Sequence, residues 1–161
     1  IKKKIRLEVE KSLDCLNLLN GASHSEVLLT KDESIKVVEI AGRMGGELIG
    51  SHMVKLSTGV DFVKAVIEVA IAEYNPQVYK PKHMGFSGVY YVIPKPGIIK
   101  EIVDNSSQYS EIVFTKPIYK IGDEVSNVID GADKRPGIIV YNSKKHKVNI
   151  EPEQVLEFHT V

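Results

Sequence analysis

The sequence has one cysteine, no excess of charge and no long apolar run. Because Cys15 is the only thiol in 161 residues, the chain cannot close an internal disulfide, and a reducing cytoplasm is the expected compartment. The 21 basic and 21 acidic side chains cancel, so the charge balance does not indicate a nucleic-acid or membrane-surface partner. No stretch reaches the ~20 apolar residues that a membrane-spanning helix needs.

Common catalytic and binding motifs are also missing from the sequence. It contains no Walker-type phosphate loop, no GxGxxG segment and no Ser-His-Asp order, and His83, His146 and His159 have no metal-ligand spacing. Its 43% apolar and 26% charged residues are typical of a globular protein, and its length allows one or two small domains. The chain starts at Ile1, within an expected helix, so we expect it to be a fragment of a longer protein.

Two segments have the apolar spacing of helices. In residues 1–20, apolar side chains recur every three or four positions, and an Asn-Gly pair follows as a C-terminal stop. Cys15 lies within this pattern, and we expect it to be buried because free cysteine behaves as a small apolar side chain. A second helix is expected from Thr58 to about Tyr74. Thr58 is its expected N-cap, and Asp61 in the first turn complements the helix dipole.

A β-hairpin is expected between these helices. Two short apolar runs, residues 27–30 and 35–40, flank a polar linker of four residues. If the turn is symmetric, Thr30 faces Ile35 and Glu26 lies directly opposite Glu39. Side chains alternate between the two faces of a strand, so one face is expected to carry Glu26, Leu28, Thr30, Ile35, Val37 and Glu39.

The paired carboxylates indicate a metal site. Glu26 and Glu39 would repel each other on one sheet face unless a cation lay between them. Oxygen-only ligation suits Mg²⁺ or Mn²⁺, which also keeps water and phosphate oxygens as ligands. The alternative is an ordinary surface hairpin with two solvated glutamates. A register slip of one residue would also separate the carboxylates onto opposite faces.

Three further features lie beside the hairpin. Arg43 follows Glu39 by four residues, and its planar guanidinium could hold a phosphate or carboxylate beside the metal. Gly45 and Gly46 belong to a glycine-rich segment that allows a close approach of backbone to an anion, although such glycines equally suit a plain loop. His24 would share the face of Glu26 and could contact substrate or metal, or it could be an ordinary loop histidine.

The second half of the chain is rich in short β-type runs. After a linker with two prolines, at residues 75–82, strands are expected at 88–93, 98–103, 112–114, 118–121 and 138–141. Pro152 is expected to start a short helical turn. Regular turn signals between short strands indicate a small, mostly antiparallel sheet.

The order of the acidic, glycine and arginine residues resembles the C-terminal half of an ATP-grasp domain. The resemblance rests on Glu26 before a turn, Glu39-Ile-Ala-Gly-Arg43, Gly45-Gly46 and Thr58-Gly59-Val60-Asp61. It covers residues 5–75 and continues more weakly through residues 90–97, which resemble the C-terminal domain of biotin-carboxylase-like members. It implies an α/β (α+β) fold. Residues 1–75 would form the C-terminal part of an ATP-grasp lobe, as helix, antiparallel hairpin and helix, and residues 76–161 a small β-rich domain.

The resemblance also implies an ATP-dependent ligase that uses ATP and Mg²⁺ or Mn²⁺. In that family a carboxylate is phosphorylated by ATP, and an amine then attacks the acyl phosphate. Glu26 and Glu39 would match the acidic residues that bind metal and nucleotide, and Arg43 the catalytic arginine. The expected partners are small carboxylate and amine substrates, with amino acids foremost, and no nucleic acid or membrane. A homodimer is an arrangement that the sequence leaves open.

Ala41 departs from the family pattern, which has Asn at this position of the Glu-x-Asn-x-Arg segment. Ligases that join amino acids to carboxylates include members with a similar segment that lacks this Asn, so the departure does not exclude catalysis. An amino-acid or dipeptide ligase is the leading interpretation. One alternative is a bicarbonate-activating enzyme like biotin carboxylase or carbamoyl-phosphate synthetase, against which Ala41 counts. Another is a non-catalytic regulatory or assembly domain. We expect the isolated fragment to be inactive under all three.

Overall fold

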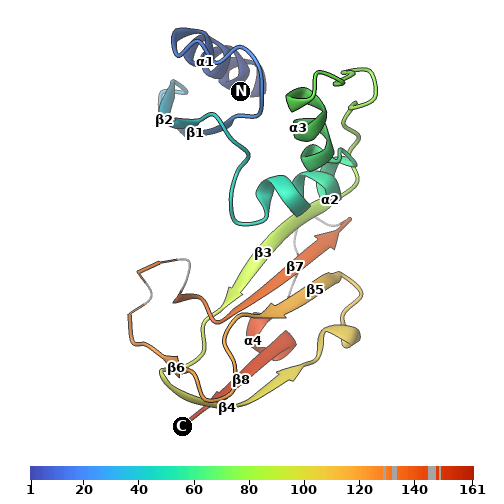
Figure 1. The fold of residues 1–161 in the computed structure, drawn as a ribbon. Coiled ribbons are helices and arrows are strands. Elements are labelled where there is room, and N and C mark those ends of the chain that lie inside the picture. Colours follow the sequence, from blue (N-terminus) through green and yellow to red (C-terminus); the bar gives the residue numbers. More distant parts are fainter. Residues whose placement is uncertain (129, 132–133, 145–147, 149) are drawn as a thin grey trace. The chain divides into compact units, whose positions relative to one another are not determined.

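The computed structural model describes residues 1–128, 130–131, 134–144, 148 and 150–161. The chain forms two compact units (Figure 1). Unit 1 comprises residues 1–55 and 59–82, and unit 2 comprises residues 56–58 and 83–161. The division predicted from the sequence, between a nucleotide-binding part and a β-rich part at residues 75 and 76, stays a prediction.

Unit 1 contains helices and a two-stranded antiparallel sheet. Helix α1 spans Lys2–Cys15, strand β1 spans His24–Leu29 and strand β2 spans Ile35–Ala41. Helix α1 packs against β2. The expected hairpin is thus confirmed, with one face of its second strand beneath the N-terminal helix.

The first helix is shorter than the sequence indicates, and its cysteine is not buried. Helix α1 ends at Cys15, and Asn17 takes a left-handed conformation with φ of 54°, so the apolar pattern beyond it is not helical. Cys15 is exposed, and the prediction that it is buried is wrong. The reason is that a sheet of two strands covers only part of a helix, and no residue of α1 is fully buried.

The second predicted helix, from Thr58 to about Tyr74, is observed only as α3, and a separate helix, α2, ends where it was predicted to begin. Helix α2 spans Val54–Thr58 and ends at Gly59, whose φ of 74° is a left-handed conformation that glycine adopts without strain. Helix α3 spans Phe62–Ala70, and Asp61 is its N-cap. Thr58 therefore ends one helix instead of capping the next, and the predicted N-cap was wrong by three residues.

The described residues of unit 2 form two three-stranded antiparallel sheets. One has the order β3-β7-β5 and the other β6-β4-β8. Their bounds are β3 Phe86–Val92, β4 Gly97–Asp104, β5 Ile112–Pro117, β6 Glu124–Val125, β7 Gly137–Ser143 and β8 Leu156–Thr160. A short 3₁₀-helix, η2, spans Ser106–Gln108, and helix α4 spans Pro152–Val155, so the helical turn predicted at Pro152 is confirmed. The core joins both sheets and α4, and its buried members are Val92, Ile99, Val125, Ile139, Val155, Leu156 and Phe158.

One predicted strand is a loop, and two strands, β6 and β8, were not predicted. In residues 118–121, the amides of Ile118 and Tyr119 both donate to the carbonyl oxygen of Pro136 at 2.8 and 3.1 Å, so the segment turns instead of extending a ladder. Strand β8 follows α4 directly and pairs with β4. A strand with no turn signal before it is hard to recognise from sequence alone. The mixed α/β class with antiparallel sheets is confirmed.

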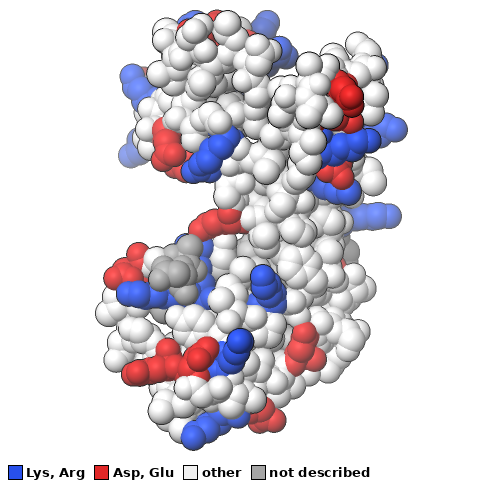
Figure 2. Space-filling view, in the orientation of Figure 1, with Lys and Arg blue, Asp and Glu red and all other residues white. Residues whose placement is uncertain are grey.

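The distribution of charge on the surface and the hydropathy of the helices agree with the composition of the sequence. On the face shown in Figure 2, described acidic and basic side chains are interspersed in each unit. Among the described residues, no helix combines the length and the hydropathy that crossing a membrane requires.

Candidate functional site

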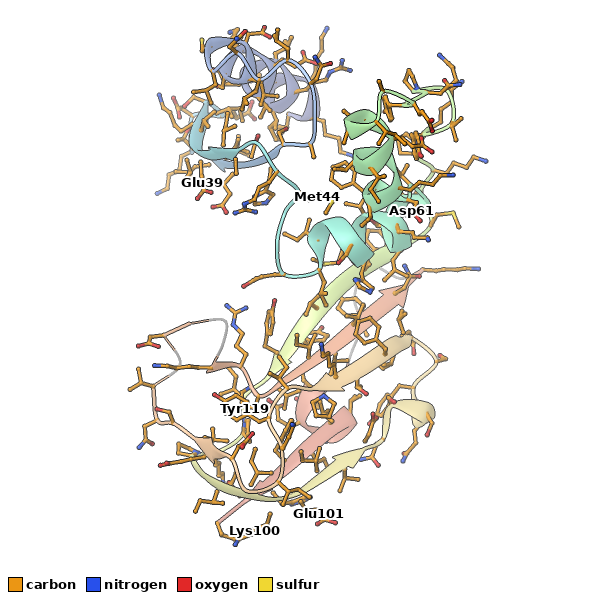
Figure 3. The ribbon with its side chains drawn as sticks, viewed as in Figure 1. Glu39, Met44, Asp61, Lys100, Glu101 and Tyr119 are labelled. Carbon is orange, nitrogen blue, oxygen red and sulfur yellow. The ribbon has the colours of Figure 1, made fainter. Side chains whose placement is uncertain are left out.

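The two glutamates singled out from the sequence lie opposite each other in the hairpin. Glu26 of β1 pairs with Glu39 of β2, as predicted. Both side chains are exposed. Cβ atoms of directly opposed residues lie roughly 5 Å apart, so both carboxylates can reach one cation above the sheet. Figure 3 shows Glu39 on the side of the hairpin that is turned away from α1.

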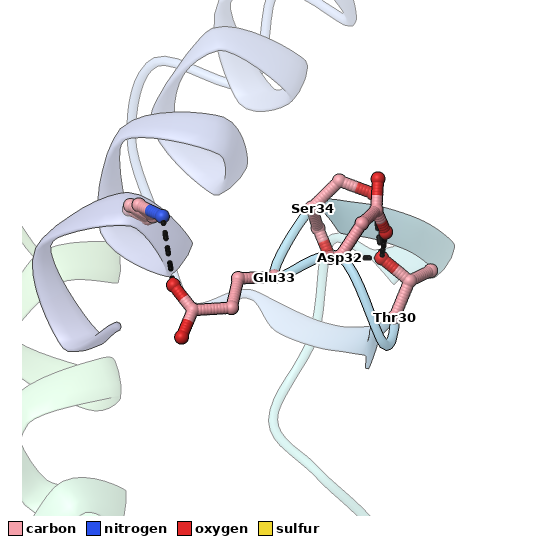
Figure 4. Close-up of polar contacts among 5 residues, drawn as sticks. Thr30, Asp32, Glu33 and Ser34 are labelled. Atoms are coloured by element: carbon pink, nitrogen blue, oxygen red, sulfur yellow. Dashed lines mark hydrogen bonds and ion pairs between the residues drawn. The ribbon is translucent and has the colours of Figure 1, made fainter.

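The predicted turn differs from the observed one by a residue. Leu29, not Thr30, pairs with Ile35, so the loop has five residues instead of four. Thr30 belongs to the loop because its amide donates to the carbonyl oxygen of Ser34 at 3.0 Å and its hydroxyl donates to Asp32 (Figure 4). The Thr30 hydroxyl lowers the pKa of the Asp32 carboxyl below its usual value. The loop is also tied to α1 by the Lys4–Glu33 ion pair at 3.4 Å (Figure 4).

A β-bulge restores the pairing that the longer loop would otherwise shift. The register passes from Val27 opposite Val37 directly to Glu26 opposite Glu39, so Val38 is the extra residue of β2. Val38 is 66% exposed. The pairing of Glu26 with Glu39 was therefore predicted correctly, but only because two errors cancel. The predicted loop was one residue too short, and the bulge in β2 was not predicted.

The bulge changes which residues accompany the glutamates. Val37 pairs with Val27 and Ile35 pairs with Leu29, so neither shares the face of Glu26, and the prediction that they do is wrong. Lys36 pairs with Leu28 instead. Since Leu28 lies two residues from Glu26, Lys36 is on the carboxylate face. Simple alternation along the sequence assigns Lys36 to the other face, and a bulge has no clear sequence signal.

His24 and Gly45 come together beside this face. His24 pairs with Ala41 and shares the face of Glu26. A Cβ on Gly45 would lie 3.0 Å from Cδ2 of His24, whereas one on Gly46 would meet no atom within 4 Å. The two glycines therefore differ: Gly45 leaves room for the imidazole, and Gly46 faces open space.

Arg43 lies in the loop that leaves β2. Its side chain is exposed, and its Nη1 donates to the carbonyl oxygen of Met44 at 2.9 Å. A guanidinium has five N–H donors, so this bond fixes one edge and leaves others for an anion. Figure 3 places Met44 in the segment that runs from the hairpin toward the next helix.

The loop after Gly46 has unusual backbone geometry that the sequence did not reveal. Glu47 and Leu48 have φ values of 48° and 66°, in the left-handed region that non-glycine residues seldom adopt. They lead into a π-helix, η1, at Ile49–Met53. Buried Gly50 lies against Met44, whose Cβ would be 2.9 Å from a Cβ at position 50. Such strain persists only where surrounding contacts hold it.

Asp61 has a structural role outside the hairpin. Its Oδ1 accepts a hydrogen bond from the Lys64 amide at 3.1 Å, and its Oδ2 pairs with Lys55 Nζ at 2.7 Å. Lys55 and then the Lys64 amide lower the pKa of the Asp61 carboxyl, because both stabilise the carboxylate. The preference for a structural over a catalytic Asp61 agrees with this geometry, although the residue caps the helix instead of lying within its first turn.

The donor set fits a metal ion that is shared with a ligand. The described residues contain no group of three or more His, Cys, Asp or Glu placed to hold a metal. The Glu26–Glu39 pair supplies hard oxygen donors on an open face. Mg²⁺ typically takes one or two carboxylates and completes its coordination with water and phosphate oxygens. The pair therefore suits a metal bound together with a phosphorylated ligand, not a closed protein site.

Comparison with known proteins identifies the fold. No protein-family model and no curated protein sequence matches the chain. Phosphoribosylglycinamide synthetase from Anaerococcus prevotii aligns with 99% of the chain and 42% of its own length, at a TM-score of 0.80 and 21% identity. L-amino acid ligase from Bacillus licheniformis aligns with 99% of the chain and 41% of its own length, at a TM-score of 0.78 and 20% identity.

A third solved structure is less similar. The biotin carboxylase domain of 2-oxoglutarate carboxylase from Hydrogenobacter thermophilus, in complex with MgADP, ADP and bicarbonate, aligns with 77% of the chain and 28% of its own length. Its TM-score is 0.50 and its identity 17%. The chain thus has a partial ATP-grasp fold, like that of ATP-grasp ligases, and the family resemblance is confirmed at the level of the fold. It spans about two fifths of the length of the first two structures.

Proposed function

We propose that this chain is part of an ADP-forming carboxylate–amine ligase. The observation that carries the proposal is the Glu26–Glu39 pair, which two strands of an ATP-grasp fold hold face to face. In the proposed reaction a carboxylate oxygen attacks the γ-phosphorus of ATP, and the bond to the β,γ-bridging oxygen breaks to release ADP. The amine nitrogen then attacks the acyl carbon, loses a proton and expels phosphate, which leaves an amide.

The residues of this chain divide the work between charge and position. Glu26 and Glu39 would hold Mg²⁺ or Mn²⁺, which when bound neutralises negative charge on phosphate oxygens. Arg43 supplies a fixed positive fork for a phosphate or for the substrate carboxylate, with one edge anchored on Met44. His24 lies on the same face and Gly45 adjoins it. In this proposal both contact the substrate, together with Gly46. Phosphoryl transfer depends on this kind of positioning and charge stabilisation.

Amino acids are the proposed substrates. One similar structure is named as an amino acid ligase, and another as a synthetase of a glycinamide, which is by its name an amide of glycine. Both align with nearly the whole chain. The bicarbonate-bound carboxylase supports the second candidate, a bicarbonate-activating enzyme, but it aligns with 77% of the chain at a lower TM-score. Ala41 in the segment after Glu39 also favours the amino-acid ligase. The single cysteine fits a reducing cytoplasm, which is the proposed compartment.

The decisive experiment measures release of ADP and phosphate by the full-length protein with ATP and Mg²⁺. The panel comprises single amino acids, pairs of amino acids and bicarbonate. Amino-acid-dependent release that disappears in Glu39→Gln supports the ligase and its metal site. Release with bicarbonate alone supports the second candidate. A protein that releases no ADP and binds no Mn²⁺ contradicts both and leaves a non-catalytic domain.

A further inference from the structure

The bulge at Val38 gives the carboxylate face a positive charge that strand alternation would not place there. Lys36 pairs with Leu28, and Leu28 and Glu26 point to the same side of β1. Glu26, Leu28, Lys36 and Glu39 are all exposed, while Val27 and Val37 on the other face are partly covered. Bulges commonly re-aim a side chain next to an active site.

The position of Lys36 allows it to reach an anion held at the two glutamates. It is a diagonal neighbour of Glu26 across the strands, and such neighbours have Cβ atoms roughly 7 Å apart. A lysine side chain can span most of that distance. Among the described residues, no ion pair includes Lys36, Glu26 or Glu39. The ammonium group of Lys36 therefore does not neutralise either carboxylate.

We propose that Lys36 binds a phosphate group of the nucleotide at the Glu26–Glu39 site. This inference rests on the proposed function, because it needs a phosphorylated ligand that shares a cation with the two glutamates. Lysine acts on phosphate as a compact point charge. It stands on the same face as the metal-binding carboxylates, and Arg43 approaches from the loop that follows β2. The phosphate is thus met by a cation from each of two segments.

The proposal makes two binding constants move in opposite directions. Replacing Lys36 by Ala removes a phosphate ligand, so the dissociation constant of ADP in the presence of Mn²⁺ should rise about tenfold. The same change removes a positive charge close to the carboxylates, so Mn²⁺ alone should bind about twofold more tightly. If Lys36 had only a structural role, its replacement by Ala would weaken the binding of both ADP and Mn²⁺.

The test uses the full-length protein, with Mn²⁺ binding measured by electron paramagnetic resonance and ADP binding by calorimetry. Lys36→Gln provides a second variant that removes the charge but keeps a polar side chain. Lys31→Ala is the matched control, because Lys31 lies exposed in the turn of the same hairpin, outside the paired strands. Lys36→Arg, which keeps the charge, should recover part of the ADP affinity.

The outcomes separate this inference from the proposed function. Opposite shifts in Lys36→Ala, with Lys31→Ala like the wild type, support it. ADP affinity equal to that of Lys31→Ala, or parallel loss of Mn²⁺ and ADP, overturns it while leaving the proposed function standing, provided that Glu39→Gln still loses Mn²⁺ binding. If the wild type binds neither probe, the proposed function fails and the role of Lys36 fails with it.

Discussion

The ring of His24 occupies the space that a side chain at position 45 would need. An ideal Cβ on Gly45 would lie 3.0 Å from Cδ2 of His24 and 3.1 Å from Cβ of Ile49, closer than most real contacts. The first strand and the loop after the second strand therefore meet at a point where only glycine fits without movement. This contact links the geometry of the loop to the carboxylate face.

We expect Gly45→Ala to push His24 out of place. The substitution should lower the free energy of unfolding by about 1 kcal/mol and reduce kcat/KM of the full-length protein. Gly46→Ala is the matched control, because no atom lies within 4 Å of its Cβ, and it should change stability by less than about 0.5 kcal/mol. Adding His24→Ala to Gly45→Ala should recover part of the lost stability, because the close contact with Ile49 remains. Equal losses of stability at both glycines would contradict the contact.

The opposed glutamates should repel each other when no metal is bound. Glu39→Gln removes one like charge, so the metal-free protein should gain about 0.5 kcal/mol in the free energy of unfolding. The same variant should lose the increase in Tm that Mn²⁺ gives the wild type. Glu33→Gln, in the turn of the hairpin, serves as the control and should keep that increase. Thermal unfolding with and without Mn²⁺ measures both the stability of the metal-free protein and the increase in Tm that Mn²⁺ gives. An unchanged increase in Tm in Glu39→Gln would rule out the metal site.

Arg43 should require its planar fork, not merely its charge. Arg43→Ala should lower kcat/KM by about 100-fold if the guanidinium stabilises charge in the transition state. Arg43→Lys should not restore activity, since a point charge cannot form two parallel hydrogen bonds. Arg6→Lys, an exposed change on α1, controls for general effects. Wild-type activity in Arg43→Lys would contradict the proposed role.

Asp61 should make stability depend on pH at the acidic end. Its pKa is lower in the folded state than in the unfolded chain, so its contribution is present above the unfolded value of about 3.9 and is lost as the pH falls through the folded value. Asp61→Asn keeps an N-cap but cannot titrate, so it should remove this pH dependence. It should also lower the free energy of unfolding by less than Asp61→Ala does. Urea unfolding from pH 6 down to pH 3 measures the difference. A pH profile of Asp61→Asn identical to the wild type would contradict the assignment.

Two adjacent isoleucines on β4 test the core of unit 2. Ile99 is fully buried and Ile98 is 46% exposed. Ile99→Ala should lower the free energy of unfolding by about 3 kcal/mol, because it leaves a cavity among side chains from both sheets. Ile98→Ala should cost less than about 1 kcal/mol. Denaturant unfolding of both variants checks the assignment, and similar losses at the two positions would count against the observed facing of β4.

Glu26 and Glu39 were predicted to oppose each other, but that result depended on two errors that cancel, a loop one residue too short and a missed bulge. The sequence by itself determined the existence of the hairpin and the β-rich character of the second half. These features follow from short-range rules, because alternation of apolar side chains and turn residues act within a few positions. The carboxylate pair was also the basis of the family resemblance, which the solved structures confirm for the fold. The roles of Glu26, Glu39, Arg43 and His24 stay predictions.

Only the tertiary structure decided which residues accompany that pair and which side chains are covered. The five-residue loop and the bulge at Val38 together moved Lys36 onto the carboxylate face, and no local pattern specifies where a strand takes an extra residue. Cys15 is exposed because burial depends on what packs over a position, and only a two-stranded sheet lies beneath its helix. Strand β8 exists because β4 offers it a partner, and that partner lies more than fifty residues away in the sequence.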